Sequence, residues 1–174
     1  MNFSIQSNST DETQTLGFAL GRLILQIPLN NPFIVALSGT LGAGKTLFST
    51  SCCTALGVNP LAISSPTFSL QNQYSGTADG ITVPINHFDF YRFKDEDEIF
   101  GIGFDETISQ PGVHLIEWAD KFIELIGQEC LQIRIQSPQP TVRILDFYAN
   151  GEEPTKVLKL FSLEVAKEKT NRAN

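Results

Sequence analysis

Residues 33–46 read Phe-Ile-Val-Ala-Leu-Ser-Gly-Thr-Leu-Gly-Ala-Gly-Lys-Thr, and this stretch decides the fold. Its apolar start, Phe33 to Leu37, is typical of a buried strand. The strand leads into Gly39-x-x-x-x-Gly44-Lys45-Thr46, the complete pattern of a phosphate-binding loop. We expect a helix to follow, from about Gly44 to Leu56. A strand before the loop and a helix after it are the context that this pattern requires.

The glycines of the loop suit it to a bound anion. Gly39, Gly42 and Gly44 permit backbone angles and a close approach that a side chain would block, and the loop N–H groups form an anion-sized nest. Lys45 is expected to reach the β- and γ-phosphates of a nucleotide, and the Thr46 hydroxyl to ligate Mg²⁺. The alternative is an ordinary glycine-rich turn. The residues expected to contact the nucleotide here are Gly39, Thr40, Leu41, Gly42, Ala43, Gly44, Lys45 and Thr46.

The composition of the 174-residue chain is that of a soluble globular protein of one domain. The apolar share is 41% and the formal net charge is −7. Broad, charge-driven binding of DNA or RNA needs a basic surface, so this charge argues against it. A role in RNA metabolism through a protein partner stays open.

The cysteines and the start of the chain favour a cytoplasmic protein. Cys52 and Cys53 are adjacent and Cys130 stands alone, which fits neither a disulfide framework nor a paired-cysteine metal site. We therefore expect buried thiols in a reducing cytosol. We expect no signal peptide, because no basic start precedes an apolar core, and no stretch has the length of a membrane span.

The first half of the chain places strands and a helix around the loop. Residues 2–7 alternate as a short edge strand would, and Ser9 or Thr10 can cap the helix that follows. Residues 69–74 and 81–90 predict two strands, joined by a turn at Ser75-Gly76 and Asp79-Gly80.

The second half completes the predicted sheet. A helix beginning near Lys94 and a helix over 119–126 flank a short apolar strand at 113–116, and residues 131–135 and 142–148 alternate as an antiparallel pair on one edge of the sheet. The tail after Gly151 is expected to be helical and frayed from about residue 165. We predict one domain over residues 1–174, with a three-layer α/β P-loop NTPase fold whose central sheet is mostly parallel with an antiparallel edge.

A P-loop ATPase also needs a carboxylate near Mg²⁺, normally at the carboxyl end of a strand beside the loop. Asp89 and Glu117 both end such strands, and either could instead be a surface residue. His87 and His114 lack the spacing of metal ligands, so packed histidines are the better interpretation. Trp118 could lie beside the nucleotide or simply fill core space.

Four motifs occur in an order that resembles one protein family. They are Gly39 to Thr46, Ser65-Pro66-Thr67-Phe68, His87-Phe88-Asp89-Phe90-Tyr91-Arg92 and Ile116-Glu117-Trp118. Together they resemble the TsaE (YjeE) family, the bacterial ATPases of tRNA threonylcarbamoyladenosine synthesis, over roughly residues 5–150. The sequence departs from the family at Thr40, where an acidic residue is usual, and in the less basic Leu47 to Thr50. We expect nucleotide binding to survive both departures.

The resemblance implies roles for particular residues. Thr46 and Glu117 would ligate Mg²⁺, and Asp89 would be the Walker-B-type carboxylate. Thr67 would lie in a switch loop near the γ-phosphate, and the chain around Thr10 near the adenine of ATP.

The resemblance also implies partners. The TsaB–TsaD heterodimer transfers threonylcarbamoyl to adenosine 37 of tRNA, and TsaE is thought to drive turnover of that complex by hydrolysing ATP. Contact with tRNA would be indirect only.

Two other functions deserve comparison with a partner-dependent ATPase. A small-molecule kinase usually carries an arginine-rich lid over the transferred phosphate, and the five arginines of this chain form no such cluster. A nucleotide-sensing module without catalysis would lack a carboxylate at the metal, and Asp89 and Glu117 argue against it.

Overall fold

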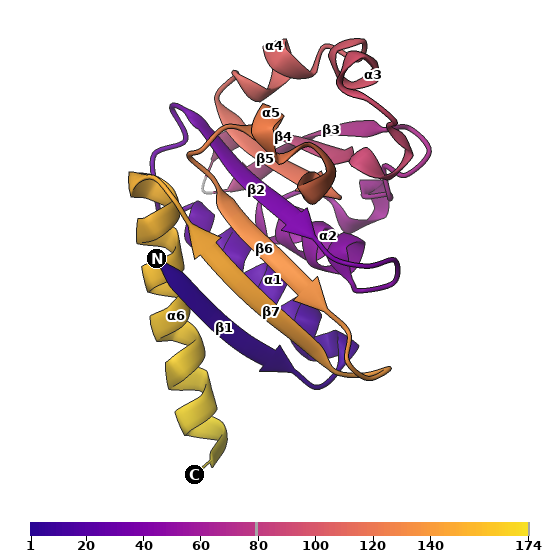
Figure 1. Cartoon of the computed structure of the whole chain (residues 1–174). Helices are drawn as coiled ribbons and strands as arrows, with labels where there is room; N and C mark the ends of the chain where they lie inside the picture. The colour runs from indigo at the N-terminus through magenta and orange to yellow at the C-terminus, as the bar shows by residue number, and fades with distance from the viewer. Residues whose placement is uncertain (79, 174) are drawn as a thin grey trace.

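The computed structural model describes residues 1–78 and 80–173, and its strands form one mixed sheet (Figure 1). The sheet has seven strands in the order β1-β7-β6-β2-β5-β4-β3. Their bounds are β1 (Asn2–Ser7), β2 (Pro32–Ser38), β3 (Gln71–Ala78), β4 (Ile81–Asp89), β5 (Gly112–Glu117), β6 (Leu131–Gln136) and β7 (Arg143–Ala149). The central strands β6, β2, β5 and β4 are parallel, and β1, β7 and β3 pair antiparallel. The predicted parallel centre with an antiparallel edge is confirmed, and β3 makes the second edge antiparallel too.

Helices cover both faces of the sheet, which confirms the three-layer prediction (Figure 1). One face carries α1 (Thr10–Ile24), α2 (Lys45–Ala55) and α6 (Glu152–Ala173). The other face carries three short helices, α3 (Glu96–Phe100), α4 (Phe104–Ile108) and α5 (Ile123–Ile126). The 3₁₀ turns are η1 (Pro60–Ala62), η2 (Phe90–Arg92) and η3 (Ala119–Phe122).

Two apolar clusters fix the direction in which strand side chains point. Val113 and Leu115 of β5 belong to the cluster beneath α1 and α2, whereas Ile116 belongs to the cluster on the opposite face. Because side chains alternate along a strand, Glu117 continues the row that points toward α2. Asp89 lies opposite Glu117 in the parallel β4–β5 register, so both carboxylates face the start of α2.

Helix α1 packs closely against α2, the helix that follows the phosphate-binding loop. A Cβ atom added to Gly17 would lie 2.5 Å from the carbonyl oxygen of Phe48, and one added to Gly21 would lie 2.6 Å from that of Cys52. Ser9 caps α1 by accepting a hydrogen bond from the Glu12 N–H at 3.0 Å, so the first of the two predicted caps is confirmed. The packing therefore places the start of α1 beside the phosphate-binding loop.

The three cysteines are buried and free, as expected. Burial, together with the nearby Glu117 charge, raises the pKa of the Cys53 thiol to about 12. These thiols are therefore protonated core side chains at neutral pH.

Several predicted element bounds are wrong. Ser75 and Gly76 do not form a turn, because both pair with β4, opposite Pro84 and Val83. The expected helix over 119–126 is split between η3 and α5, and α4 was not expected. Asp79, part of the predicted turn, lies outside the described residues.

The C-terminal helix α6 continues to Ala173, beyond residue 165, where we expect fraying to begin. The fraying and the single-domain boundary stay predictions, and Asn174 lies outside the described residues. Within residues 1–78 and 80–173, no helix combines the length and apolarity that crossing a membrane requires.

Candidate functional site

The phosphate-binding loop connects β2 to α2 and depends on glycine where its backbone is left-handed. Gly39 and Gly44 have φ values of 140° and 108°. A Cβ atom on Gly39 would collide with the carbonyl oxygen of Ile135 in β6, so no larger residue fits there. Gly44 is the N-cap of α2, and the helix starts directly at Lys45. The N-terminal end of a helix carries a partial positive charge, which suits an anion at this position.

The Lys45 side chain lies folded over its own loop. Its amine donates hydrogen bonds to the carbonyl oxygens of Gly39 at 2.8 Å and Thr40 at 3.0 Å. The same nitrogen lies 3.7 Å from the centre of the Trp118 ring, a cation–π contact. Burial lowers the pKa of Lys45, and the charges of Glu117 and Asp89 partly oppose this shift. The amine thus stands among carboxylates at the start of α2.

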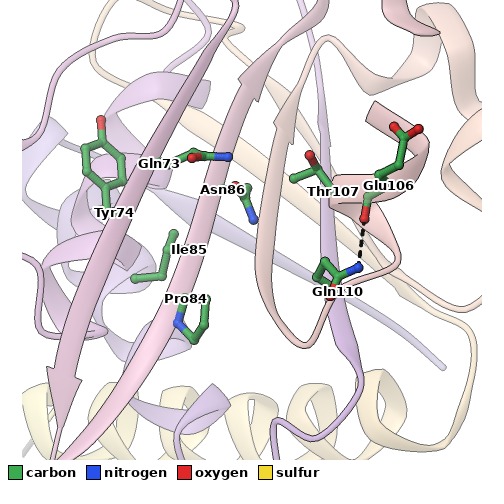
Figure 2. Close-up of a pocket in the computed structure, with 8 residues that line it drawn as sticks. All are labelled: Gln73, Tyr74, Pro84, Ile85, Asn86, Glu106, Thr107 and Gln110. Atoms are coloured by element: carbon green, nitrogen blue, oxygen red, sulfur yellow. Dashed lines mark hydrogen bonds between the residues drawn. The ribbon is translucent and has the colours of Figure 1, made fainter. Parts of the chain in front are cut away.

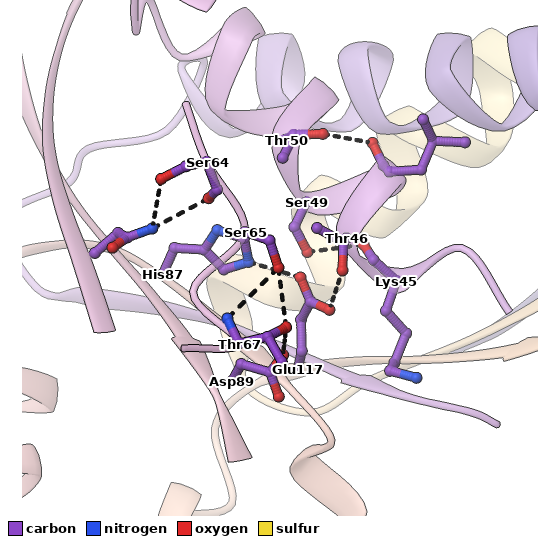
Figure 3. A network of polar contacts seen from close by, with 12 residues as sticks. Lys45, Thr46, Ser49, Thr50, Ser64, Ser65, Thr67, His87, Asp89 and Glu117 are labelled. Carbon is purple, nitrogen blue, oxygen red and sulfur yellow. Dashed lines mark hydrogen bonds and ion pairs between the residues drawn. The ribbon is translucent and has the colours of Figure 1, made fainter. Parts of the chain in front are cut away.

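Thr46 and Glu117 meet directly at this place (Figure 3). The Thr46 hydroxyl donates to Glu117 Oε2 at 2.7 Å, and His87 Nε2 lies 2.7 Å from Glu117 Oε1. The side chains of His87 and Glu117 are 0% and 1% exposed. The hydroxyl and the carboxylate are hard oxygen donors, the type of ligand that Mg²⁺ prefers.

Asp89 is bonded to the loop that carries the Ser-Pro-Thr-Phe motif. Thr67 Oγ1 donates to Asp89 Oδ2 at 2.6 Å, and the Tyr91 N–H donates to Asp89 Oδ1 at 2.8 Å. Within the loop itself, the Ser65 and Thr67 hydroxyls are hydrogen-bonded to each other at 2.9 Å (Figure 3). Asp89 therefore holds together the Thr67 loop and the turn η2.

Trp118 adopts a left-handed backbone conformation at the end of β5, with φ of 59°. Its ring lies 4.9 Å from the Tyr91 ring, at an angle of 41°. Trp118 is half-buried against the apolar cluster on the face of α3, α4 and α5, and it also lines the cavity described next. Its position beside a nucleotide stays a prediction.

These side chains enclose a cavity of about 240 Å³. One wall consists of Leu41, Gly42, Gly44, Lys45, Thr46 and Leu47. The other wall consists of Thr67, Asp89, Tyr91, Glu117 and Trp118. Both predicted carboxylates, the predicted switch threonine and the loop thus come together in one place.

Four predicted residues are not part of this lining. Gly39 and Thr40 line a neighbouring cavity next to Arg134 and Pro138, and Ala43 is buried beneath the loop. Thr10 is exposed at the first turn of α1. That turn lies near the loop, because Thr13 Cγ2 is 4.0 Å from a Cβ atom built on Gly44.

The sequence alone did not single out two residues of this region as ligand contacts. Tyr91 lies inside one of the four motifs, which was the available signal. Arg143 begins β7, and its Nε atom is 3.6 Å from a Cβ atom built on Gly44. Strand pairing, which joins β7 to β6 and β1, brings this arginine to the loop.

A separate groove of about 400 Å³ lies between the β3–β4 hairpin and α4 (Figure 2). Gln73 and Asn86 line it from the strands, and Thr107 and Gln110 line it from the α4 side. No residue predicted for nucleotide binding lies in this groove.

Comparisons with known proteins give a consistent result. Residues 7–145 match the family model described as threonylcarbamoyl adenosine biosynthesis protein TsaE. The tRNA threonylcarbamoyladenosine biosynthesis protein TsaE of Bacillus subtilis is 39% identical over 118 residues, which are 68% of this chain and 70% of that protein. The protein with the same description from Rickettsia conorii is 31% identical over 146 residues, or 84% of this chain and 78% of its own.

A solved structure has the same fold. The crystal structure of Bacillus subtilis YdiB superimposes with a TM-score of 0.68 and 26% identity, covering 94% of this chain and 96% of that one.

Proposed function

Because the chain belongs to the TsaE family of threonylcarbamoyl adenosine biosynthesis proteins, we propose that it binds ATP with Mg²⁺ and hydrolyses it. The hydrolysis drives turnover of the TsaB–TsaD complex in the modification of tRNA. Its location is the cytoplasm, where that tRNA is found. The observation that carries the proposal is that Lys45, Thr46 and Glu117 line one cavity at the start of α2, where Thr46 and Glu117 are directly bonded.

The phosphates bind at the start of α2. Lys45 exchanges the carbonyl oxygens of Gly39 and Thr40 for phosphate oxygens, which carry full negative charge and make stronger hydrogen bonds. The adenine lies toward Arg143 and the first turn of α1, which begins at Thr10, because both lie beside Gly44.

The donor set at Thr46 and Glu117 fits Mg²⁺. Mg²⁺ is commonly held by one or two protein oxygens and completes its octahedron with phosphate and water. The Thr46 hydroxyl and the Glu117 carboxylate are 2.7 Å apart at the mouth of the loop, so both can reach one ion. When bound, the ion neutralises charge that develops on the phosphates.

Asp89 and Thr67 act on the side of the γ-phosphate. Asp89 lies next to Glu117 in the sheet register, which supports a role for its carboxylate in orienting the attacking water. Its bond with Thr67 connects that carboxylate to the loop of the Ser-Pro-Thr-Phe motif, and this loop is where a partner protein would sense the nucleotide.

The kinase alternative gains no support from the cavity. A kinase lid supplies arginines to the transferred phosphate. Among the residues described, no arginine lines the cavity of Lys45 and Glu117. Arg22 instead pairs with Glu164, and Arg92 lies over the Phe68 ring.

Lys45→Ala tests the proposal. We expect ATP affinity to fall roughly 10- to 100-fold, because a hydrogen bond to a charged group contributes about 1.5–3 kcal/mol. Turnover should be abolished. Titration calorimetry with ATP, with and without Mg²⁺, measures the affinity, and Lys94→Ala, an exposed lysine, is the matched control. Wild-type affinity in Lys45→Ala would overturn the assignment of the loop.

Phosphate release by the chain alone, and then with TsaB, TsaD and tRNA, tests the second half of the proposal. We expect slow hydrolysis alone and a changed rate with the partners. Transfer of phosphate to a small molecule instead of water would favour the kinase.

A further inference from the structure

His87 occupies an unusual place for a packed core histidine. It belongs to β4, its side chain is fully buried, and it contacts the only carboxylate that also contacts Thr46 among the described residues. Its Nδ1 atom is buried without a hydrogen-bond partner. A buried polar atom without a partner costs stability, so packing alone does not account for a histidine here. Its bonded nitrogen, Nε2, is the one that contacts Glu117.

The strand register explains why this contact forms. His87 lies opposite Leu115, and Asp89 lies opposite Glu117. His87 and Glu117 are therefore diagonal neighbours on the face that points toward α2, a distance that a long side chain can bridge.

Each oxygen of Glu117 has one donor. His87 Nε2 donates to Oε1, since a carboxylate oxygen accepts, and the Thr46 hydroxyl donates to Oε2. A carboxylate held at both oxygens cannot rotate freely. If the His87 bond is removed, Oε1 keeps no hydrogen-bond donor among the described residues and the carboxylate can turn away from Thr46.

We propose that His87 is a positioning residue that orients the Glu117 carboxylate, so that Oε2 stays directed at Thr46 and at the Mg²⁺ of the nucleotide complex. This inference rests on the proposed function, because it requires Glu117 to be a metal ligand. Residues that orient a metal ligand through a hydrogen bond typically change metal affinity about 10- to 100-fold when they are replaced.

A second buried histidine gives a matched control. His114 lies on the neighbouring strand β5, is also fully buried, and donates from Nε2 to the carbonyl oxygen of Gln110 at 2.9 Å. Its other nitrogen lies 3.4 Å from the Asn86 amide, far along the strand from Glu117. Replacement of His114 therefore disturbs the core to a similar degree without touching the metal ligand.

The experiment measures metal binding rather than turnover. Mn²⁺ replaces Mg²⁺, and electron paramagnetic resonance of the free ion gives its dissociation constant from the protein–ADP complex. Metal-free ATP binding is measured by calorimetry, and folding by thermal melting. The variants are His87→Leu, which removes the donor, His87→Gln, whose amide can still reach Glu117, and His114→Leu.

We expect His87→Leu to raise the Mn²⁺ dissociation constant about 10- to 100-fold while metal-free ATP affinity changes less than about twofold. His87→Gln should restore most of the metal affinity, and His114→Leu should leave it unchanged. If His87→Leu does not fold, His87→Asn, too short to reach Glu117, takes its place.

Three results would overturn the inference. They are an unchanged Mn²⁺ constant in His87→Leu, an equal loss in His114→Leu, or no recovery in His87→Gln. If the wild-type protein itself binds no Mn²⁺ with the nucleotide, the proposed function fails as well, so the two failures are distinguishable.

Discussion

Asp89 and Glu117 end neighbouring strands at the same level of the sheet, yet they have different partners. Glu117 is bonded to Thr46 and His87, whereas Asp89 is bonded to Thr67 and the backbone of Tyr91. The two carboxylates therefore contact different parts of the site, Glu117 the start of α2 and Asp89 the loop that carries Thr67.

Replacement of each carboxylate by its amide should separate the roles proposed for them. Glu117→Gln keeps an oxygen but loses the charge, so we expect the Mg²⁺ concentration needed for half-maximal ATPase activity to rise. Asp89→Asn should depress turnover while ATP still binds. Steady-state kinetics over a Mg²⁺ series, with calorimetry for ATP, measures both. Little effect of either change would mean that both are structural strand-end residues, and the opposite pattern would mean that their roles are exchanged.

Residues of the candidate site could be predicted where they belong to a sequence motif. Contacts that depend on the register between paired strands could not be predicted. The loop residues and both carboxylates were found from local pattern, because a strand, a glycine-rich turn and a helix are adjacent in sequence. The contact of His87 with Glu117 depends on how β4 and β5 pair, and Arg143 reaches Gly44 only through the pairing of β7. The pairing of β6 with β7 could be predicted because the two strands are neighbours in the sequence, but pairings between distant segments, such as β4 with β5 and β1 with β7, cannot be read from one sequence.

At the level of elements, the contact between α1 and α2 has no space for a side chain. Gly17 faces the backbone of Phe48, and Gly21 faces that of Cys52. Since backbone atoms cannot move aside as side chains can, the glycines set the distance between the two helices and hence the position of the first turn of α1 beside the loop.

Gly17→Ala tests this contact, because helix propensity and the close packing predict opposite changes in the free energy of unfolding. In an exposed helix the change would stabilise by about 1 kcal/mol through helix propensity. Here we expect the free energy of unfolding to fall by about 1–3 kcal/mol, because the new methyl group meets the Phe48 carbonyl. Urea denaturation measures the change. Gln14→Ala, exposed on the same helix, should be neutral or slightly stabilising, and a Gly17→Ala protein as stable as that control contradicts the packing argument.

Element bounds failed where tertiary contacts overrule local preference. Ser75-Gly76 reads as a turn, but Gly76 instead lets the carbonyl of Leu56 approach β3 closely, so the strand continues through it. Of the three short helices, α3 lies where a helix is expected to begin near Lys94, and α5 ends the region where one is expected over 119–126. Only α4 was not predicted, because a helix of five residues carries too little periodicity to be recognised.

At the level of the whole molecule, the net charge of −7 limits direct contact with tRNA. Non-specific binding to nucleic acid comes from basic surface and weakens with salt. An acidic member of a tRNA-modification family therefore fits a role exerted through other proteins.

The isolated chain should bind tRNA no more tightly than about 100 µM at physiological salt. Fluorescence anisotropy with labelled tRNA measures this, and addition of TsaB–TsaD should retain the chain on the tRNA-bound assembly. Tight binding by the chain alone, with a steep dependence on salt, would show that the partner-mediated proposal is wrong.

The stacking of Lys45 on Trp118 has a practical consequence, because the chain contains one tryptophan. All indole emission of the molecule therefore originates 3.7 Å from the amine that is proposed to bind phosphate. Movement of Lys45 toward ATP should change the indole emission. A titration of that change should give the same ATP dissociation constant as calorimetry, and Lys45→Ala should abolish the change. Emission that stays constant through saturation would mean that the lysine keeps its stacked position. Intrinsic fluorescence of Trp118 should therefore report nucleotide binding without an added label, and stopped-flow measurement of it should give the rates of nucleotide association and dissociation.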